Sequence, residues 1–355
     1  MESMTVTASR YDFGAVHAAM RRYVDSNILA GVSSAVLVGR DLVDLNCVGW
    51  ADKEQDIAMR GDHLFRVFSN TKLITSCAAL LLFEEGRFQL DDPIERFIPQ
   101  LAQRRVLRPG ATALDDAEPA HGPITIRHLL SHSSGLSYGL LDPGTTIHRA
   151  YNERKVLNPA TSLSDMMDSL ADLPLVFHPG TAWEYSVATD VMARLVEIVS
   201  RQRFDAFIQS RILDPFGMVD TGFVVPEEKR HRLAAYYAGA DLADPMKPET
   251  IALMMTNQLP DGVWIRFPGV GEIQGKGFGL AGSLTLVPSA LDPKGATGEL
   301  QWGGIAGTHW WISPKANLAG LLMTQRQMAF WHPFSFEFKQ LVYAAVSRTR
   351  DESPT

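Results

Sequence analysis

Residues 69–85 have the apolar spacing of a helix but almost no polar face. The apolar residues occur on every side of the predicted helix rather than along one stripe. They are Leu73, Ile74, Cys77, Ala78, Leu81 and Leu82. Gly86 follows directly, which is typical of the position just after a helix ends. A helix without a polar face is buried, so the fold must surround this segment with other elements.

Ser69 and Lys72 open this helix as the tetrad Ser-Asn-Thr-Lys. Residues three apart share one helix face, with Cβ atoms about 5–6 Å apart. A serine hydroxyl needs an adjacent base to act as a nucleophile, and a lysine can be that base if burial lowers its pKa. The pattern is short, and chance alone gives it about once in a chain of this length. The alternative interpretation is an N-cap serine followed by a solvated lysine.

The two ends of the chain carry predicted strands, whereas its middle is mainly helical. Strands are predicted at residues 31–38, 42–50, 283–287, 308–313 and 318–324. Helices are predicted at residues 13–27, 189–200, 204–213 and 334–347, and residues 105–123 form a loop rich in proline and glycine. We therefore expect an α+β fold, in which helices flank an antiparallel sheet built from both chain ends.

The same order of elements predicts two domains. Residues 1–68 and 230–355 would form a discontinuous α/β domain. Residues 69–229 would form the inserted all-helical domain, with the Ser-x-x-Lys helix at the interface.

Charge and apolar content limit the expected partners and location. A net charge of −7 provides no general basic face for nucleic acid. No apolar run reaches the length of about 20 residues that a membrane helix needs. Residues 1–13 lack the pattern of a secretory signal. We expect a cytoplasmic protein with no nucleic-acid or membrane partner, although a periplasmic protein without its leader would give the same pattern. The sequence leaves the oligomeric state open.

Three further motifs follow the tetrad along the chain. They are Leu129–Leu136 (LLSHSSGL), Pro179–Ser186 (PGTAWEYS), and Gln301–Gly304 (QWGG) with Ala306–His309 (AGTH) after it. Their order and spacing resemble the serine β-lactamase-like superfamily, most of all the class C β-lactamases and family VIII carboxylesterases. The resemblance extends from about residue 13 to residue 346 and implies the β-lactamase-like α+β fold.

This resemblance implies a role for each matching residue. Ser69 matches the nucleophile, Lys72 its paired base, and Tyr185 the tyrosine that shares proton transfer with the lysine. An ammonium beside a phenol favours the phenolate, so Lys72 and Tyr185 are expected to titrate as a coupled pair. The backbone N–H groups of Ser69 and Ile305 match the oxyanion hole. The resemblance implies no cofactor and no metal.

Two positions depart from the β-lactamase pattern. Val187 stands where class C enzymes carry an asparagine, and Trp302 stands where they carry a cation that meets the drug's carboxylate. Together with Gly303, Gly304 and His309, they are the candidate substrate-binding residues. An apolar wall in place of a charged anchor favours neutral esters over anionic lactams.

Other candidate catalytic residues have alternative interpretations. Gly135–Gly139 fits G-x-S-x-G, the nucleophile elbow of α/β-hydrolases, which would make Ser137 the nucleophile. That motif has meaning only between a strand and a helix, and the residues before it are predicted as the end of a helix. His132 and His309 could act in proton transfer. For both we favour a hydrogen-bonded structural role.

The leading hypothesis is a carboxylesterase that hydrolyses small neutral acyl esters through a seryl acyl-enzyme. Alternatives with the same fold are a β-lactamase, a D-alanyl-D-alanine peptidase and an acyltransferase. A non-enzymatic alternative is a penicillin-recognising sensor that is acylated once and stays acylated. The expected partner is a small-molecule ester.

Overall fold

The computed structural model describes residues 11–26, 28–140, 144–235, 254–267, 271–324, 326, 330 and 332–351. The chain divides into two compact units. The first comprises Met1–Thr71, Asp220–Ala243 and Thr285–Thr355, and the second comprises Lys72–Val219 and Asp244–Leu284. The sequence placed the domain boundaries at 68/69 and 229/230.

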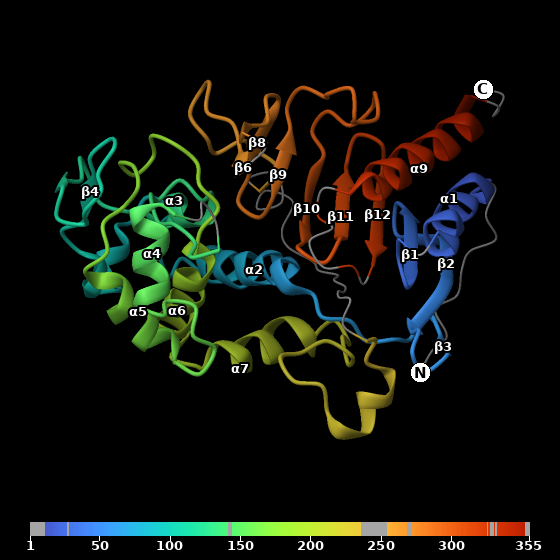
Figure 1. The fold of residues 1–355 in the computed structure, drawn as a ribbon, viewed down its shortest axis with the longest axis horizontal. Coiled ribbons are helices and arrows are strands. Elements are labelled where there is room, and N and C mark those ends of the chain that lie inside the picture. The colour runs from blue at the N-terminus through green and yellow to red at the C-terminus, as the bar shows by residue number, and fades with distance from the viewer. Residues whose placement is uncertain are drawn as a thin grey trace. The chain divides into compact units, whose positions relative to one another are not determined.

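An eight-stranded sheet has the order β3-β2-β1-β12-β11-β10-β9-β8 (Figure 1). Its strands are β1 (Gly31–Val38), β2 (Asp41–Asp52), β3 (Ile57–Ala58), β8 (Lys276–Phe278), β9 (Ser283–Thr285), β10 (Leu300–Gly304), β11 (Thr308–Ser313) and β12 (Leu318–Met323). Strand β1 pairs antiparallel with β12, from Ser33 opposite Met323 to Val38 opposite Leu318. Strands from both chain ends therefore share one sheet, which confirms the predicted α+β class.

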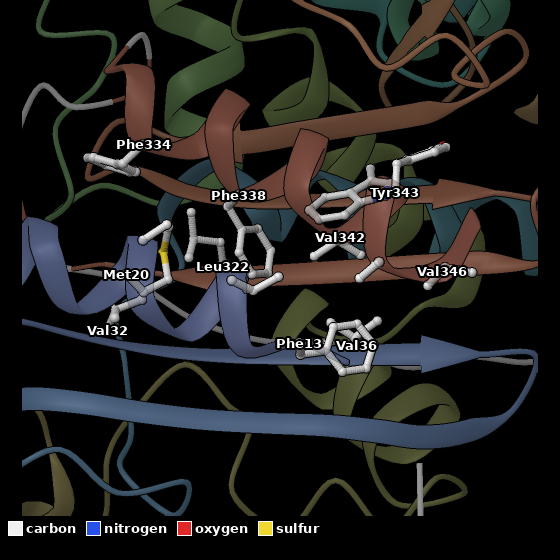
Figure 2. Close-up of a cluster of buried hydrophobic side chains, with 14 of the residues drawn as sticks. Phe13, Met20, Val32, Val36, Leu322, Phe334, Phe338, Val342, Tyr343 and Val346 are labelled. Carbon is white, nitrogen blue, oxygen red and sulfur yellow. The ribbon is translucent and has the colours of Figure 1, made fainter. Parts of the chain in front are cut away.

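Helices α1 (Gly14–Asp25) and α9 (Pro333–Asp351) pack with this sheet around one apolar core (Figure 2). The core includes side chains from both helices and from β1, β2, β11 and β12. Phe334, Phe338 and Val342 of α9 are fully buried. Burying three such side chains contributes about 5–9 kcal/mol, which is comparable to the whole net stability of a domain. Helix α9 therefore contributes a large share of the stability of this unit.

The second unit is mainly helical. It contains α2 (Thr71–Glu84), α3 (Ile126–Leu130), α4 (Thr146–Glu153), α5 (Leu163–Ala171), α6 (Ala188–Ser200) and α7 (Phe204–Ile208). The unit also contains two small hairpins, β4 (Arg105–Leu107) with β5 (Ala117–Pro119) and β6 (Arg266–Phe267) with β7 (Gly271–Glu272). Helix α6 contacts α3, α5 and α7. Among the described residues, the helices are too short or too polar to cross a membrane.

Helix α2 matches the prediction of a buried helix that is apolar on nearly every side. Eight of its fourteen residues are buried. Its end is a Schellman motif: the Gly86 N–H donates to the Phe83 carbonyl, and the Arg87 N–H donates to the Leu82 carbonyl. Gly86 has a φ of 69°, which confirms its predicted position just after the helix.

One predicted helix is interrupted. The sequence predicts a helix over 204–213, whereas α7 ends at Ile208 and a π-helical turn, Gln209–Leu213, continues it. In that turn the Asp214 N–H donates to the Gln209 carbonyl, five residues back. The wider turn leaves Ile212 and Leu213 buried, so the apolar pattern that suggested a regular helix is satisfied by the π-turn.

Candidate active site

Ser69 lies in a 3₁₀ turn, Phe68–Asn70, that leads directly into α2. The sequence predicted an α-helix from Ser69, but the α-helical residues begin at Thr71. Phe68 has a φ of 44°, a left-handed conformation that is strained for a bulky side chain. Surrounding contacts must enforce such strain, and it occurs often at functional sites. Lys72 is the second residue of α2, so it follows Ser69 within one turn.

Asn70 fastens this turn to the hairpin between β10 and β11. Its side chain is buried, and its Nδ2 donates to Thr308 Oγ1 at 3.4 Å. The same hydroxyl oxygen accepts a hydrogen bond from the Gly304 N–H at 3.1 Å. One threonine therefore holds both the residue after Ser69 and the residue before Ile305. The sequence analysis missed Asn70 and Thr308, because nothing in either motif indicates that they meet.

Gly303 and Gly304 are required by the close approach of neighbouring backbone. A Cβ atom at Gly303 would lie 2.4 Å from the Thr308 carbonyl oxygen. At Gly304 it would lie 2.6 Å from Thr308 Oγ1 and 3.2 Å from the carbonyl oxygen of Val67. These distances leave no room for a side chain. Ile305 follows them in a turn with its side chain 40% exposed, and the oxyanion role of its N–H stays a prediction.

Lys72 lies against two tyrosine rings within the second unit. Its Nζ is 4.9 Å from the ring centroid of Tyr185 and 5.5 Å from that of Tyr138. The two rings stack on each other, with centroids 5.5 Å apart and planes 20° apart. A cation over aromatic faces gains electrostatic attraction, most of all where water is excluded. The structure therefore brings together two of the three predicted catalytic side chains, Lys72 and Tyr185, and adds Tyr138.

The Lys72 pKa is shifted upward, whereas the sequence analysis expected burial to shift it downward. Burial lowers the Lys72 pKa, as expected. Attraction to Tyr185, Tyr138 and Asp190 outweighs burial, and the pKa is raised above its usual value. The prediction of a lysine that loses its proton through burial is therefore wrong. Lys72 stays an ammonium, which can stabilise negative charge on a neighbouring phenol oxygen.

Asp190 and Tyr138 are two further ionisable groups that interact with Lys72. Burial raises the Asp190 pKa, and the attraction of Lys72 opposes this effect. Asp190 Oδ2 is buried and has no hydrogen-bond partner among the described residues. Attraction to Lys72 lowers the Tyr138 pKa, whereas burial and repulsion by Tyr185 and Asp190 raise it. The raising effects are the larger, so the Tyr138 pKa lies above its usual value and the phenol keeps its proton. The sequence offered no signal for Asp190, because an aspartate in the first turn of a helix is ordinary.

His132 orients the segment that carries Tyr185. Its Nδ1 accepts the backbone N–H of Ser186 at 3.2 Å and lies 3.0 Å from the Ser186 hydroxyl. Its backbone carbonyl accepts the Glu184 N–H. Burial, with a smaller effect of Lys72, lowers the His132 pKa well below its usual value, so the ring is neutral. The expected structural role of this histidine agrees with these contacts.

Ser137 does not lie in a nucleophile elbow. Residues 131–140 contain neither a strand nor a helix, so the strand–turn–helix context of that motif is missing from this segment. The Ser137 hydroxyl is buried and donates to Glu184 Oε1. Its backbone carbonyl accepts the N–H of Val187. The side chain therefore supports the loop next to Tyr185.

The candidate substrate-binding side chains differ in exposure. Val187 is fully buried at the start of α6, so it packs in the core and does not line an exposed surface. Trp302 is 6% exposed, and its ring meets that of Phe330 edge-on at 5.8 Å. His309 lies 5.2 Å from the same phenyl ring, and burial with a smaller effect of Lys339 lowers its pKa to about 3. Neutral His309 and the ring of Trp302 remain predicted pocket residues.

The sequence profile of the Beta-lactamase family matches residues 16–330, which is most of the chain. The chain belongs to the Beta-lactamase family. Esterase EstB of Burkholderia gladioli is 28% identical over 89% of this chain and 91% of its own. An uncharacterised protein of Mycobacterium tuberculosis is 32% identical over 87% of this chain and 88% of its own. The predicted family is therefore confirmed.

Solved structures confirm the serine β-lactamase-like fold of this family member. EstCE1, described as a hydrolase with promiscuous acyltransferase activity, has a TM-score of 0.79 at 22% identity and covers 93% of this chain and 98% of its own. Simvastatin synthase LovD of Aspergillus terreus has a TM-score of 0.76 at 23% identity, with the same coverage of 93% and 98%. At such identities the likeness shows the fold alone.

Proposed function

We propose that this member of the Beta-lactamase family is a carboxylesterase that hydrolyses small neutral acyl esters through a seryl acyl-enzyme. The observation that carries the proposal is the Lys72 ammonium held 4.9 Å from the centre of the Tyr185 ring, one turn after Ser69. A positive charge beside a phenol is the arrangement that makes a phenolate base. The name of EstB, an esterase with similarity over nearly the whole chain, supports the same chemistry.

In the proposed acylation step, the Tyr185 phenolate takes the Ser69 Oγ proton while Oγ attacks the ester carbonyl carbon. The Lys72 ammonium stabilises the phenolate before transfer. The backbone N–H groups of Ser69 and Ile305 would stabilise the tetrahedral oxyanion. The Tyr185 phenol then returns the proton to the leaving alcohol, and the acyl group remains on Ser69. In deacylation, water replaces the alcohol and the same steps run in reverse order.

Preference for neutral esters rests on two positions. Trp302 places an apolar ring where a charged anchor would meet an anionic substrate, and Val187 removes the amide that would meet a lactam side chain. Because Val187 is buried, we do not expect its side chain to contact the substrate. It affects substrate preference only because it lacks the amide group that an asparagine would offer to a lactam.

Acyl transfer to an alcohol is a second candidate, favoured by the names of several relatives. Acyltransferase calJ of Penicillium decumbens is 28% identical over 78% of this chain and 78% of its own. Adding alcohols of increasing size to the ester assay and measuring the transfer product by mass spectrometry separates the two functions. A transfer rate that exceeds hydrolysis in dilute alcohol would make the protein an acyltransferase.

The test of the main proposal compares p-nitrophenyl butyrate with the lactam nitrocefin and compares two serine variants. We expect the ester to be the better substrate by kcat/KM. Ser69→Ala should lose several orders of magnitude in rate, and Ser137→Ala should keep most of the activity of the folded protein. Faster turnover of nitrocefin would favour a β-lactamase. A single stoichiometric burst without turnover would identify a sensor.

A further inference from the structure

Glu118, His121 and His178 form a cluster of potential metal ligands that has no part in the proposed acyl transfer. One potential ligand atom of each residue lies within 4.8 Å of those of the other two. Among the described residues, these three side chains thus form a group compact enough to share one metal ion. Glu118 belongs to β5, and His121 follows two residues after that strand. His178 precedes the Pro179–Ser186 motif. All three lie in the second unit.

The distance between the Glu118 and His178 ligand atoms fits a small tetrahedral ion. His178 Nε2 is 3.4 Å from Glu118 Oε1. Two ligands at about 2.0–2.2 Å from a tetrahedral Zn²⁺ are separated by about 3.3–3.5 Å, so one ion can bind both atoms without a large movement. The imidazole rings of His121 and His178 are stacked, with centroids 3.5 Å apart and planes 9° apart. An imidazole nitrogen binds a metal in the plane of its own ring, so one of the two stacked rings must rotate about its Cβ–Cγ bond before a single ion can bind both.

Neighbouring groups already orient two of the ligands. Arg108 Nε lies 3.3 Å from Glu118 Oε2. The other carboxylate oxygen, Oε1, therefore faces His178. The backbone N–H of His121 donates to His178 Nδ1 at 3.3 Å, so in this state the His178 proton is on Nε2. Metal binding through Nε2 moves that proton to Nδ1 and breaks this long hydrogen bond. The loss is small compared with a metal–imidazole bond.

We propose that Glu118, His121 and His178 bind one divalent ion of the zinc class, with water completing the coordination. Two imidazoles and one carboxylate are the donor set that suits Zn²⁺ and neighbouring first-row ions better than Mg²⁺ or Ca²⁺. The sequence analysis expected no metal, as the family resemblance implied. The cluster gives no sequence signal, because His178 is distant along the chain from the other two ligands.

The ion would connect the β4–β5 hairpin region to the segment that leads to Tyr185. Two backbone hydrogen bonds already hold this segment: Gly180 N–H to the Ser133 carbonyl, and Glu184 N–H to the His132 carbonyl. Binding an ion to the folded state alone raises stability. We therefore expect the ion to raise the melting temperature of the protein.

The test titrates ZnCl₂ into the full chain without a histidine tag, by calorimetry. We expect one ion per chain. His121→Ala, His178→Ala and Glu118→Gln should each weaken binding by more than about tenfold, since even second-shell losses at zinc sites reach that size. His231→Ala is the matched control, because His231 is an exposed histidine elsewhere and its removal should leave binding unchanged. EDTA should reverse the rise in melting temperature.

Lack of Zn²⁺ binding by the wild-type protein would overturn the proposal. Equal weakening by His231→Ala, or wild-type binding by His121→Ala, would also overturn it. If a variant fails to fold by circular dichroism, the visible spectrum of Co²⁺ bound to the wild-type protein still decides. Intense bands indicate the four-coordinate site, and weak six-coordinate bands contradict it.

Discussion

Replacing Tyr185 by phenylalanine tests proton transfer separately from packing. The substitution removes one oxygen atom and keeps the ring. The Lys72 Nζ lies 4.9 Å from the centre of that ring, and the ring stacks on Tyr138 at 5.5 Å. Both contacts involve ring faces, which phenylalanine retains. We expect the variant to fold normally and to bind substrate almost as well as the wild type.

The expected loss in Tyr185→Phe follows from the role of a single positioned base. General acid–base catalysis contributes about 10²–10⁴-fold. At 1.36 kcal/mol for each factor of ten, this is about 2.7–5.4 kcal/mol of transition-state stabilisation. The assay is steady-state hydrolysis of p-nitrophenyl butyrate, in which kcat should fall by this factor with KM nearly unchanged.

Tyr138→Phe is the matched control, because its ring lies against the same ammonium. The raised pKa of Tyr138 keeps its phenol protonated, so it is not expected to accept the serine proton. Its loss should be less than about tenfold, well below that of a general base. Equal losses in the two variants would refute the assignment of Tyr185. A Tyr185→Phe variant with wild-type kcat would refute the mechanism.

Three further substitutions test the structure around the site. Gly304→Ala should lower kcat about 10²-fold, because its Cβ displaces the turn that precedes Ile305, and steady-state kinetics on folded protein measures this. Lys339→Met removes the cation that the buried Glu299 and Asp292 carboxylates share, and it should cost about 3–5 kcal/mol in urea unfolding. Glu299→Gln in the double variant should restore part of this loss. A hydrogen bond from Arg232 lowers the Asp220 pKa from 3.8 to about 2. The paired carboxylate thus stabilises the fold above pH 4 and loses this effect as the pH falls toward 2. Asp220→Asn should therefore lower the free energy of unfolding by about 1 kcal/mol at pH 7, after allowance for exposure, and by almost nothing at pH 2.

Elements with a strong apolar period were predictable from the sequence. Helix α2 and its end at Gly86 follow from a continuous apolar pattern and one glycine, and β11 was predicted with its observed bounds, Thr308–Ser313. Strands β3 and β8 were not predicted, because two or three residues are too few to show alternation. Their pairing depends on neighbouring strands and not on their own sequence.

Site residues that belong to a recognisable motif could be predicted from the sequence. Contacts between residues that lie far apart along the chain could not. The motifs led to Ser69, Lys72 and Tyr185, and the structure places Lys72 against Tyr185. The predicted direction of the Lys72 pKa was wrong, because burial is visible in an apolar sequence, but the combined attraction of Tyr185, Tyr138 and Asp190 that outweighs it is not. Asn70 illustrates the same limit, since its bond to Thr308 joins opposite ends of the chain.

The central claim is that Ser69 carries the acyl group, and trapping the covalent intermediate tests it most directly. The protein would be exposed briefly to an ester-like phosphonate, and intact-protein mass spectrometry followed by peptide mapping would locate the adduct. The account predicts one adduct per chain, on the peptide that contains Ser69. An adduct on the peptide that contains Ser137 would contradict it, as would an unmodified protein that still hydrolyses esters.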